Sequence, residues 1–132
     1  MTGKYIALPT FCGERGALSV AEGCKEAPFE IRRAFFLYDL PELAHRGRHI
    51  YRRQELVVCV HGACRVMIDD GAGETVFELN DPARGLLIPA DTWRDISDFA
   101  PGTVLAVLSD ALFSEDDYLW DRDALGRERT AD

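Results

Sequence analysis

Most of this sequence is a series of short segments, each followed by a turn-forming residue. The segments either alternate between polar and apolar residues or are apolar throughout. The clearest pair is residues 64–68 and 75–79, which flank Gly71. Glycine adopts a positive φ at little cost, so the pair predicts a hairpin. About eight such strands favour an all-β jelly roll, and 132 residues suit a single domain over residues 1–132. The other expected strands include residues 29–39, 55–60, 85–88 and 103–108.

The C-terminal region is the one part of the sequence that we expect to be helical. Ser114 is a good N-cap residue, and Asp117 follows three positions later in a variant of the capping box. Tyr118, Leu119 and Leu125 then supply apolar positions for a helix to bury. The sequence therefore predicts a short C-terminal helix after the last core strand.

Charge and apolar patterning argue against several classes of protein. The chain has 15 Lys and Arg against 23 Asp and Glu, a net charge of -8. Nucleic-acid binding requires a basic face, so we expect no nucleic-acid partner, whereas a nucleotide needs only a few arginines in one pocket. No apolar run reaches membrane-spanning length and no signal-peptide pattern begins the sequence, so we expect no membrane contact. The 4 cysteines form no C-x-x-C pair, which is typical of a reduced cytoplasmic protein.

His49 and Tyr51 stand two positions apart on an expected strand, so both point to one face. Histidine, with an ordinary pKa of about 6.5, accepts a proton near neutrality, while tyrosine, at about 10, stays protonated and can donate to an oxyanion. Arginine binds phosphate through paired hydrogen bonds. With arginines nearby, the pattern suits proton abstraction beside the carbonyl of a sugar diphosphate. The residues alone do not choose this over other chemistry, or over a half-buried structural strand.

The same two residues share a spaced pattern with Glu55 and Gly62. The pattern H-x-H-x3-E-x6-G resembles the first motif of the cupin barrels, with Tyr51 in place of the second histidine. This resemblance implies a jelly-roll barrel of the cupin class with His49 facing inward.

The second cupin motif is only faintly present, in residues 85–94, and Trp93 or Arg94 occupies its histidine position. One histidine and one glutamate are a poor ligand set for a divalent first-row metal, and a nearby arginine opposes a cation further. We therefore expect no metal and no other cofactor.

Six segments, in order, resemble the sugar 3,4-ketoisomerases, WxcM-like cupins that act on dTDP-4-keto-6-deoxyglucose. Residues 28–36 resemble the PFEIKRVYY strand of that family, and residues 46–51 stand where it has RG-x-HAH. The resemblance implies an isomerase that converts a dTDP-linked 4-keto-6-deoxyhexose into its 3-keto isomer through an enediol, in deoxysugar or aminosugar biosynthesis. It also implies a homodimer with the N-terminal strands exchanged or packed across the interface. The other segments are residues 14–22, 62–71, 85–93 and 117–118.

The two histidines of HAH are the catalytic pair in that family. His49 matches the first, which removes the proton at C3 and returns one at C4, and Arg46 matches the arginine ahead of it. Tyr51 stands in place of the second, which moves the hydroxyl proton. Arg94 stands where relatives often have histidine. Two alternatives therefore stay open: a nucleotide-sugar-binding cupin without ketoisomerase activity, and a related sugar epimerase.

The predicted catalytic residues are thus His49 and Tyr51. Arg33 alternates onto a face with apolar residues, an odd place for a charge unless that face lines a pocket. Plain structural roles remain open for other candidates: a core or dimer position for Trp93, a core position for Tyr38 and a solvent-facing one for Arg84. The predicted substrate-binding residues each offer a guanidinium or an aromatic ring: Arg33, Tyr38, Arg46, Arg84, Trp93 and Arg94.

Overall fold

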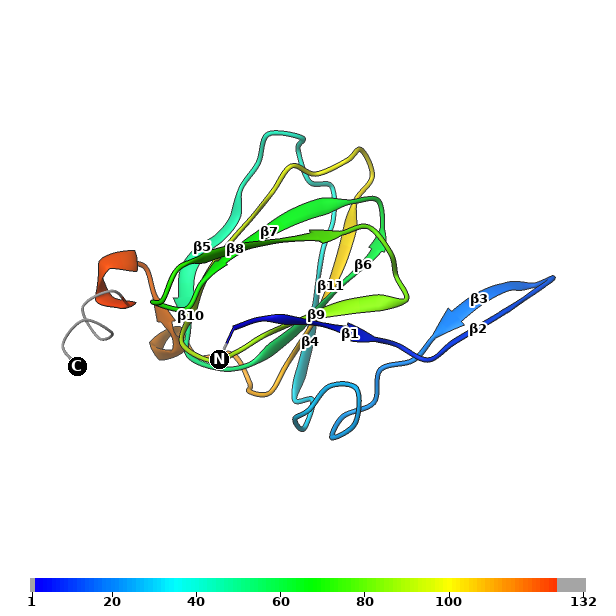
Figure 1. The fold of residues 1–132 in the computed structure, drawn as a ribbon, viewed down its shortest axis with the longest axis horizontal. Coiled ribbons are helices and arrows are strands. Elements are labelled where there is room, and N and C mark those ends of the chain that lie inside the picture. The colour runs from blue at the N-terminus through cyan, green and yellow to red at the C-terminus, as the bar shows by residue number, and fades with distance from the viewer. Residues whose placement is uncertain (1, 126–132) are drawn as a thin grey trace.

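Two antiparallel sheets form facing walls in the part of the chain that the structure, a computed structural model, describes: residues 2–125 (Figure 1). The first sheet contains, in spatial order, β1 (Lys4–Ala7), β9 (Arg84–Ile88), β6 (Glu55–His61), β11 (Val104–Ser109) and β4 (Arg33–Leu37). The second contains β12 (Tyr118–Leu119), β5 (Arg46–Tyr51), β10 (Thr92–Ser97), β7 (Cys64–Asp69) and β8 (Glu74–Leu79). This arrangement confirms the predicted all-β fold.

The core lies between the sheets because alternate residues of each strand point inward. Strand β7 has the pattern of buried residues at every second position, and β11 has the same period. The middle of the first sheet is also covered on its outer face, where Leu8, Ala27 and Phe29 pack on Leu56 and Leu87. Strands β6 and β9 are therefore apolar on both faces, as the uninterrupted runs in the sequence predict. Side chains buried between the sheets include Val57, Val66, Ile68, Leu86, Ile88, Leu105 and Val107.

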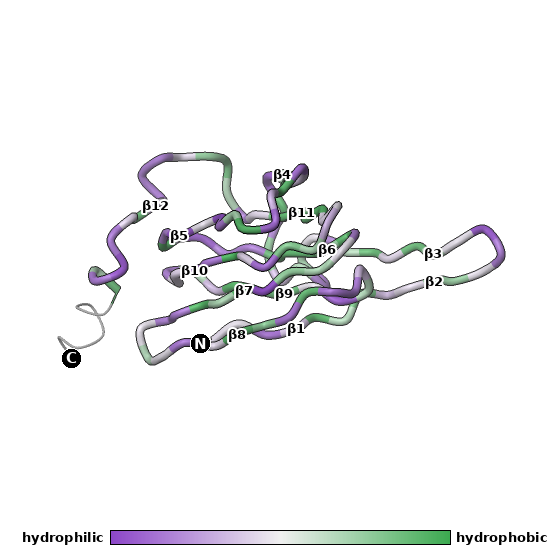
Figure 2. Tube along the Cα trace, turned by 90° about the horizontal axis from the view of Figure 1, so that it is seen from above, coloured by the Kyte–Doolittle hydropathy of each residue, from purple (hydrophilic) through white to green (hydrophobic). Residues whose placement is uncertain are grey.

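The predicted hairpin over residues 64–79 is confirmed. Its register runs from Cys64 opposite Leu79 to Asp69 opposite Glu74, and Gly71 in the turn has a φ of 97°. A second hairpin, β2 (Thr10–Gly13) with β3 (Gly16–Ser19), pairs only with itself among the described residues. Figure 2 shows that this hairpin extends away from both sheets and has a hydrophilic tip.

The C-terminal region differs from the prediction in detail. Residues Glu115–Asp117 form a single 3-10 turn, η1, and the Ser114 side chain makes no capping hydrogen bond. Tyr118 and Leu119 are extended and pair with Tyr51 and Ile50 of β5. The open edge of β5 offers backbone partners that local capping preferences do not take into account, so tertiary pairing overrides them. The helical conformation begins only at residue 122 and covers residues 122–125 of the described part of the chain. No helix within residues 2–125 has the length and apolar character needed to span a membrane.

Candidate active site

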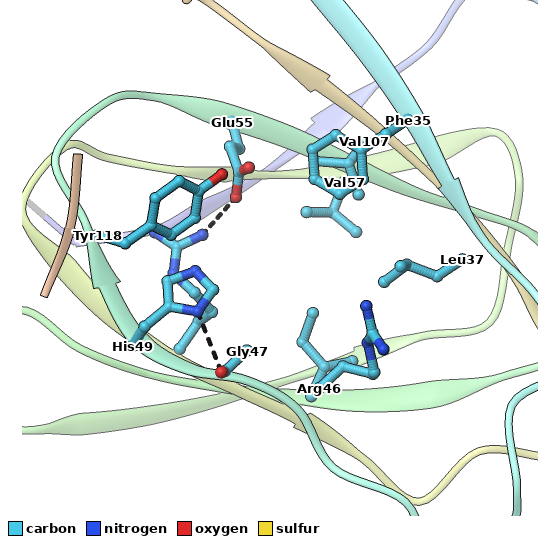
Figure 3. A pocket seen from close by; sticks show the side chains of 11 residues that line it. Phe35, Leu37, Arg46, Gly47, His49, Glu55, Val57, Val107 and Tyr118 are labelled. Carbon is cyan, nitrogen blue, oxygen red and sulfur yellow. Dashed lines mark hydrogen bonds and ion pairs between the residues drawn. The ribbon is translucent and has the colours of Figure 1, made fainter. Parts of the chain in front are cut away.

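A cavity of about 170 Å³ lies between the two sheets and is lined from β4, β5, β6, β10, β11 and β12. His49 and Tyr118 project from one side, and the apolar side chains of Phe35, Leu37 and Val107 form the opposite side (Figure 3). Pockets that enclose drug-sized ligands measure roughly 300–1,000 Å³. The cavity therefore suits a group the size of one sugar ring, and the remainder of a larger ligand must extend outside it.

A bulge in β5 sets the position of His49. The pairing of β5 with β10 shifts register between Arg94 and Asp95, and Gly47 and Arg48 have φ values of 88° and 55°. A Cβ atom on Gly47 would lie 2.9 Å from Cγ and 3.0 Å from the carbonyl oxygen of Arg94. Both the positive φ and the close approach therefore require glycine here.

The backbone of the bulge fixes the tautomer of His49. Nδ1 of His49 lies 3.0 Å from the carbonyl oxygen of Gly47 (Figure 3). A carbonyl oxygen can only accept a hydrogen bond, so Nδ1 carries the proton and Nε2 carries the lone pair. The free nitrogen is therefore the one that can act as a base.

The surroundings of His49 keep it neutral. Burial lowers its pKa from 6.5 to about 4, the positive charges of Arg94 and Arg46 act in the same direction, and the Gly47 hydrogen bond opposes them. Near pH 7 the imidazole is therefore unprotonated and can accept a proton at once.

Two aromatic rings cover His49 because β12 pairs with β5. The rings of Tyr118 and Trp120 meet the imidazole edge-on, with centroid distances of 4.9 Å and 5.2 Å. Neither residue is in the set predicted from the sequence. Their spacing of two is a strand signal, whereas the capping pattern at Ser114 places Tyr118 in the expected helix.

The side chain of Tyr51 is buried in the interior of the protein and is not among the residues that line the cavity. Its side chain is fully buried, and its hydroxyl lies 2.8 Å from Oγ of Ser109 and accepts a hydrogen bond from Nη2 of Arg33 at 3.3 Å. Burial raises its pKa above 10, so the phenol stays protonated near neutral pH. The predicted shared face of His49 and Tyr51 exists, but the two polar groups have different neighbours.

Arg33 connects the two tyrosines. The same Nη2 that donates to Tyr51 donates to the hydroxyl of Tyr118 at 3.1 Å. Its guanidinium also lies over the rings of Phe35 and Phe113, at 5.2 Å and 5.5 Å from their centroids. The predicted charge on this apolar face is therefore held by aromatic rings and hydroxyl groups, and Arg33 itself is not among the residues that line the cavity.

Arg94 and Glu55 form a buried ion pair at the cavity. Nη1 of Arg94 donates to Glu55, while Nε and Nη2 donate to the carbonyl oxygen of Thr92. These bonds fix the guanidinium and leave one N–H on each terminal nitrogen for a ligand. The sequence places Glu55 in a metal motif, whereas in the structure its carboxylate neutralises an arginine.

The remaining predicted residues divide into two groups. Arg46 is exposed and lines the cavity (Figure 3). Three others lie outside the cavity lining. Tyr38 is 65% exposed beyond the end of β4, the guanidinium of Arg84 lies 3.9 Å from the centroid of the Tyr5 ring, and Trp93 alternates to the opposite face of β10 from Arg94. Their roles in binding stay predictions.

Donor groups for a metal are sparse around the cavity. Within residues 2–125, no three His, Cys, Asp or Glu side chains come close enough together to hold a metal ion. Among the described residues the neutral His49 hydrogen-bonds only to the Gly47 carbonyl, and Glu55 is bound to Arg94. The absence of metal stays a prediction.

Two facing antiparallel sheets around a cavity that holds one neutral histidine define a jelly-roll barrel of the cupin class. A family model described as "FdtA: WxcM-like, C-terminal" matches residues 1–129. The chain therefore belongs to the FdtA/WxcM-like family, as the resemblance predicts.

Characterised relatives agree with this assignment. The chain is 32% identical over 120 residues to the TDP-4-oxo-6-deoxy-alpha-D-glucose-3,4-oxoisomerase of Aneurinibacillus thermoaerophilus. The matched segment covers 90% of this chain and 86% of that protein. A 3,4-ketoisomerase from Helicobacter canadensis matches with a TM-score of 0.93 at 30% identity, over 98% of each chain. A His-to-Asn mutant of the 3,4-ketoisomerase QdtA from Thermoanaerobacterium thermosaccharolyticum, in complex with TDP-4-keto-6-deoxyglucose, matches with a TM-score of 0.93. Its identity is 27%, over 98% of this chain and 95% of QdtA.

Proposed function

We propose that the protein is a sugar-nucleotide 3,4-ketoisomerase that converts a dTDP-linked 4-keto-6-deoxyhexose into its 3-keto isomer. The observation that carries this proposal is the neutral His49 in the cavity, with Nδ1 held by Gly47 and Nε2 free. The relatives named above support it, since they are 3,4-ketoisomerases and QdtA is seen with TDP-4-keto-6-deoxyglucose. The reaction belongs to deoxysugar or aminosugar biosynthesis.

In the proposed reaction, His49 is the general base. Nε2 takes the proton from C3, and the electron pair of the C3–H bond forms a C3–C4 double bond while the C4 carbonyl electrons move to oxygen. The same imidazole then returns a proton to C4, and the C3 oxygen becomes the carbonyl. A second group must move a proton between the two oxygens, because the hydroxyl and carbonyl exchange places.

The cavity and its charges suggest how the substrate lies. The hexose ring fits the cavity, and its methyl group suits the apolar side formed by Phe35, Leu37 and Val107. The nucleotide diphosphate then extends toward solvent, where the exposed Arg46 is placed to bind phosphate oxygens. A net charge of -8 makes such a local cation more important for holding an anionic ligand.

A second candidate function is a nucleotide-sugar-binding protein without ketoisomerase activity. The observation that favours it is the hydroxyl of Tyr51, which is held by Ser109 and Arg33 and does not line the cavity. A barrel that lost its second histidine in this way could still bind the ligand.

Proton NMR of the keto sugar in deuterated water separates these functions. We expect the wild-type protein to convert TDP-4-keto-6-deoxyglucose into a 3-keto product that carries deuterium at C4, and to exchange the C3 proton of the remaining substrate for deuterium. The His49→Asn variant should lose roughly 10²–10⁴-fold in turnover, the usual contribution of a general base. It should still be stabilised by dTDP in a thermal-shift assay, because phosphate binding does not need the imidazole.

Each other outcome points elsewhere. A wild-type protein that binds dTDP but exchanges no sugar proton is a binding protein. Exchange at C5, or exchange without movement of the carbonyl, indicates an epimerase. Full turnover by His49→Asn contradicts the assignment of the base.

We also propose a cytoplasmic homodimer. The hairpin β2–β3 is exposed along its whole length and pairs only with itself within residues 2–125, and isolated two-stranded hairpins are marginally stable in water. Contact with a second copy would bury Phe11 and Leu18, which are 66% and 59% exposed.

The cytoplasmic location is supported by the free thiols, which suit a reducing compartment: Cys12, Cys24, Cys59 and Cys64.

A further inference from the structure

The hydroxyl-proton transfer requires a group that reaches the sugar oxygens, and the sequence points to Tyr51 for this role. Tyr51 is poorly placed for it. Its side chain is fully buried, and its hydroxyl is held between Oγ of Ser109, at 2.8 Å, and Nη2 of Arg33, at 3.3 Å. It does not contribute to the cavity lining.

Tyr118 lies directly opposite Tyr51 in the sheet and does line the cavity. Directly opposed residues of an antiparallel pair share a face, and the two rings are 5.0 Å apart. A backbone hydrogen bond of 2.9 Å from the Arg52 N–H to the Asp117 carbonyl anchors the start of β12 against the end of β5. The sheet therefore brings a second phenol to the side of the cavity that holds His49 (Figure 3).

The hydroxyl hydrogen of Tyr118 is available. Arg33 donates to the Tyr118 oxygen at 3.1 Å and so occupies an acceptor position, and no group within residues 2–125 accepts the hydrogen in return. The ring meets the His49 imidazole at 4.9 Å, so the base and this donor are adjacent. The guanidinium charge of Arg33 can stabilise the phenolate that forms when the proton leaves.

We propose that Tyr118 is the catalytic residue that carries the hydroxyl proton, and that Tyr51 is a positioning residue that holds Arg33. This inference rests on the proposed ketoisomerase function.

Each proton in the proposed transfer has a donor and an acceptor. After His49 removes the C3 proton, the enediolate oxygen on C4 takes the proton of the Tyr118 hydroxyl, which leaves a phenolate. The phenolate then removes the proton from the hydroxyl on C3, whose electrons form the new C3 carbonyl. The double-bond electrons take the proton of the His49 imidazolium at C4, so both side chains return to their starting states.

The two tyrosines are distinguished by comparing two rates in deuterated water. Without the oxygen-to-oxygen shuttle, the His49 imidazolium can still exchange its proton for deuterium from the solvent and return it to C3, which gives labelled substrate. We expect Tyr118→Phe to keep C3 exchange within about tenfold of wild type while product formation falls roughly 10²–10⁴-fold, so the ratio of exchange to product rises. Tyr51→Phe and its matched variant Ser109→Ala should lower both rates together and leave the ratio unchanged.

A second variant guards against a loss of folding. Tyr118→His restores a group that can donate and accept, and it should recover product formation relative to Tyr118→Phe. The proposal is overturned if Tyr51→Phe raises the ratio and Tyr118→Phe does not, if neither variant changes the ratio, or if Tyr118→His gives no recovery. A wild-type protein that neither exchanges C3 nor forms product overturns the ketoisomerase function itself, and the assignment of Tyr118 with it.

Discussion

At the scale of a single residue, the local environment of His49 determines its chemistry. Its pKa of about 4 results from burial and from the charges of Arg94 and Arg46, against the pull of the Gly47 carbonyl. An exposed histidine with a pKa of 6.5 would be partly protonated near pH 7. A protonated imidazole cannot accept a proton from a substrate. On the proposed function, the arginines that suit an anionic substrate therefore also keep the imidazole of His49 unprotonated.

This pKa predicts the pH dependence of activity. Because protonation of His49 in the free enzyme occurs near pH 4, kcat/KM should show no fall between pH 7.5 and pH 5 due to this group. The measurement is a pH-rate profile with saturating and subsaturating substrate. A fall centred near pH 6.5 contradicts the assigned environment.

The lowered pKa of His49 also predicts that the free energy of unfolding decreases as the pH falls. The unfolded chain binds a proton at His49 below about pH 6.5, whereas the folded chain does so only near pH 4, so acid favours unfolding between these values. Compared with His49→Asn, the wild-type protein should therefore lose more free energy of unfolding between pH 7 and pH 5. Urea titrations of both proteins at the two pH values measure this difference.

At the scale of elements, the bulge at Gly47 and Arg48 connects the sheet to the base. We expect Gly47→Ala to cost about 1–2 kcal/mol, the penalty of a left-handed backbone for a residue with a Cβ, and to displace the carbonyl that holds His49. Its kcat/KM should fall by more than its loss of folded protein explains.

Gly62→Ala is the matched control for this prediction. Gly62 also has a positive φ, of 86°, and a Cβ there would lie 2.7 Å from Cα of Thr103. It is not among the residues that line the cavity. We expect this variant to be destabilised but to keep kcat/KM per folded molecule, as measured by denaturant unfolding and steady-state kinetics. Normal activity in Gly47→Ala contradicts the proposed role of the bulge.

The sequence predicts elements well where the signal is local. The hairpin over residues 64–79 follows from its alternation and from Gly71, and both are read within one short segment. Strand β12 does not follow in this way, because two residues become a strand only when the edge of β5 is beside them. Local capping signals at Ser114 therefore predict a helix too early in the chain.

The site shows the same limit for single residues. The spacing of His49 and Tyr51 indicates one face of β5, and both side chains do lie on that face. Arg33, on the apolar face of β4, donates to Tyr118 but is not itself among the residues that line the cavity, so its role in binding stays a prediction. The pairing of Arg94 with Glu55 depends on two strands that are distant in sequence, so spacing alone assigns Glu55 to a metal motif. The hydrogen-bond partners of the Tyr51 and Tyr118 hydroxyls likewise depend on strands that are distant in sequence.

At the scale of the whole molecule, the protruding hairpin predicts the assembly. We expect light scattering to give a dimer at micromolar concentration, and a Phe11→Ser, Leu18→Ser double variant to shift it toward monomer by removing apolar contact area. Val76→Ser is the control, since Val76 is 55% exposed on β8, away from the hairpin, and should leave the dimer intact. A strict monomer of the wild-type protein contradicts the proposed homodimer.

The pairing of Tyr118 with Tyr51 has a consequence for how such enzymes diverge. By its resemblance to the ketoisomerases, Tyr51 stands where that family has the second histidine of its HAH motif. In the sheet, however, the facing residue on the neighbouring strand offers a phenol to the same region. On our proposal, a role can pass between positions that are distant in the chain, because evolution acts on neighbours in space. Drift at one of two facing positions is then tolerated while the other supplies the proton, and an apparently broken active site can belong to a working enzyme.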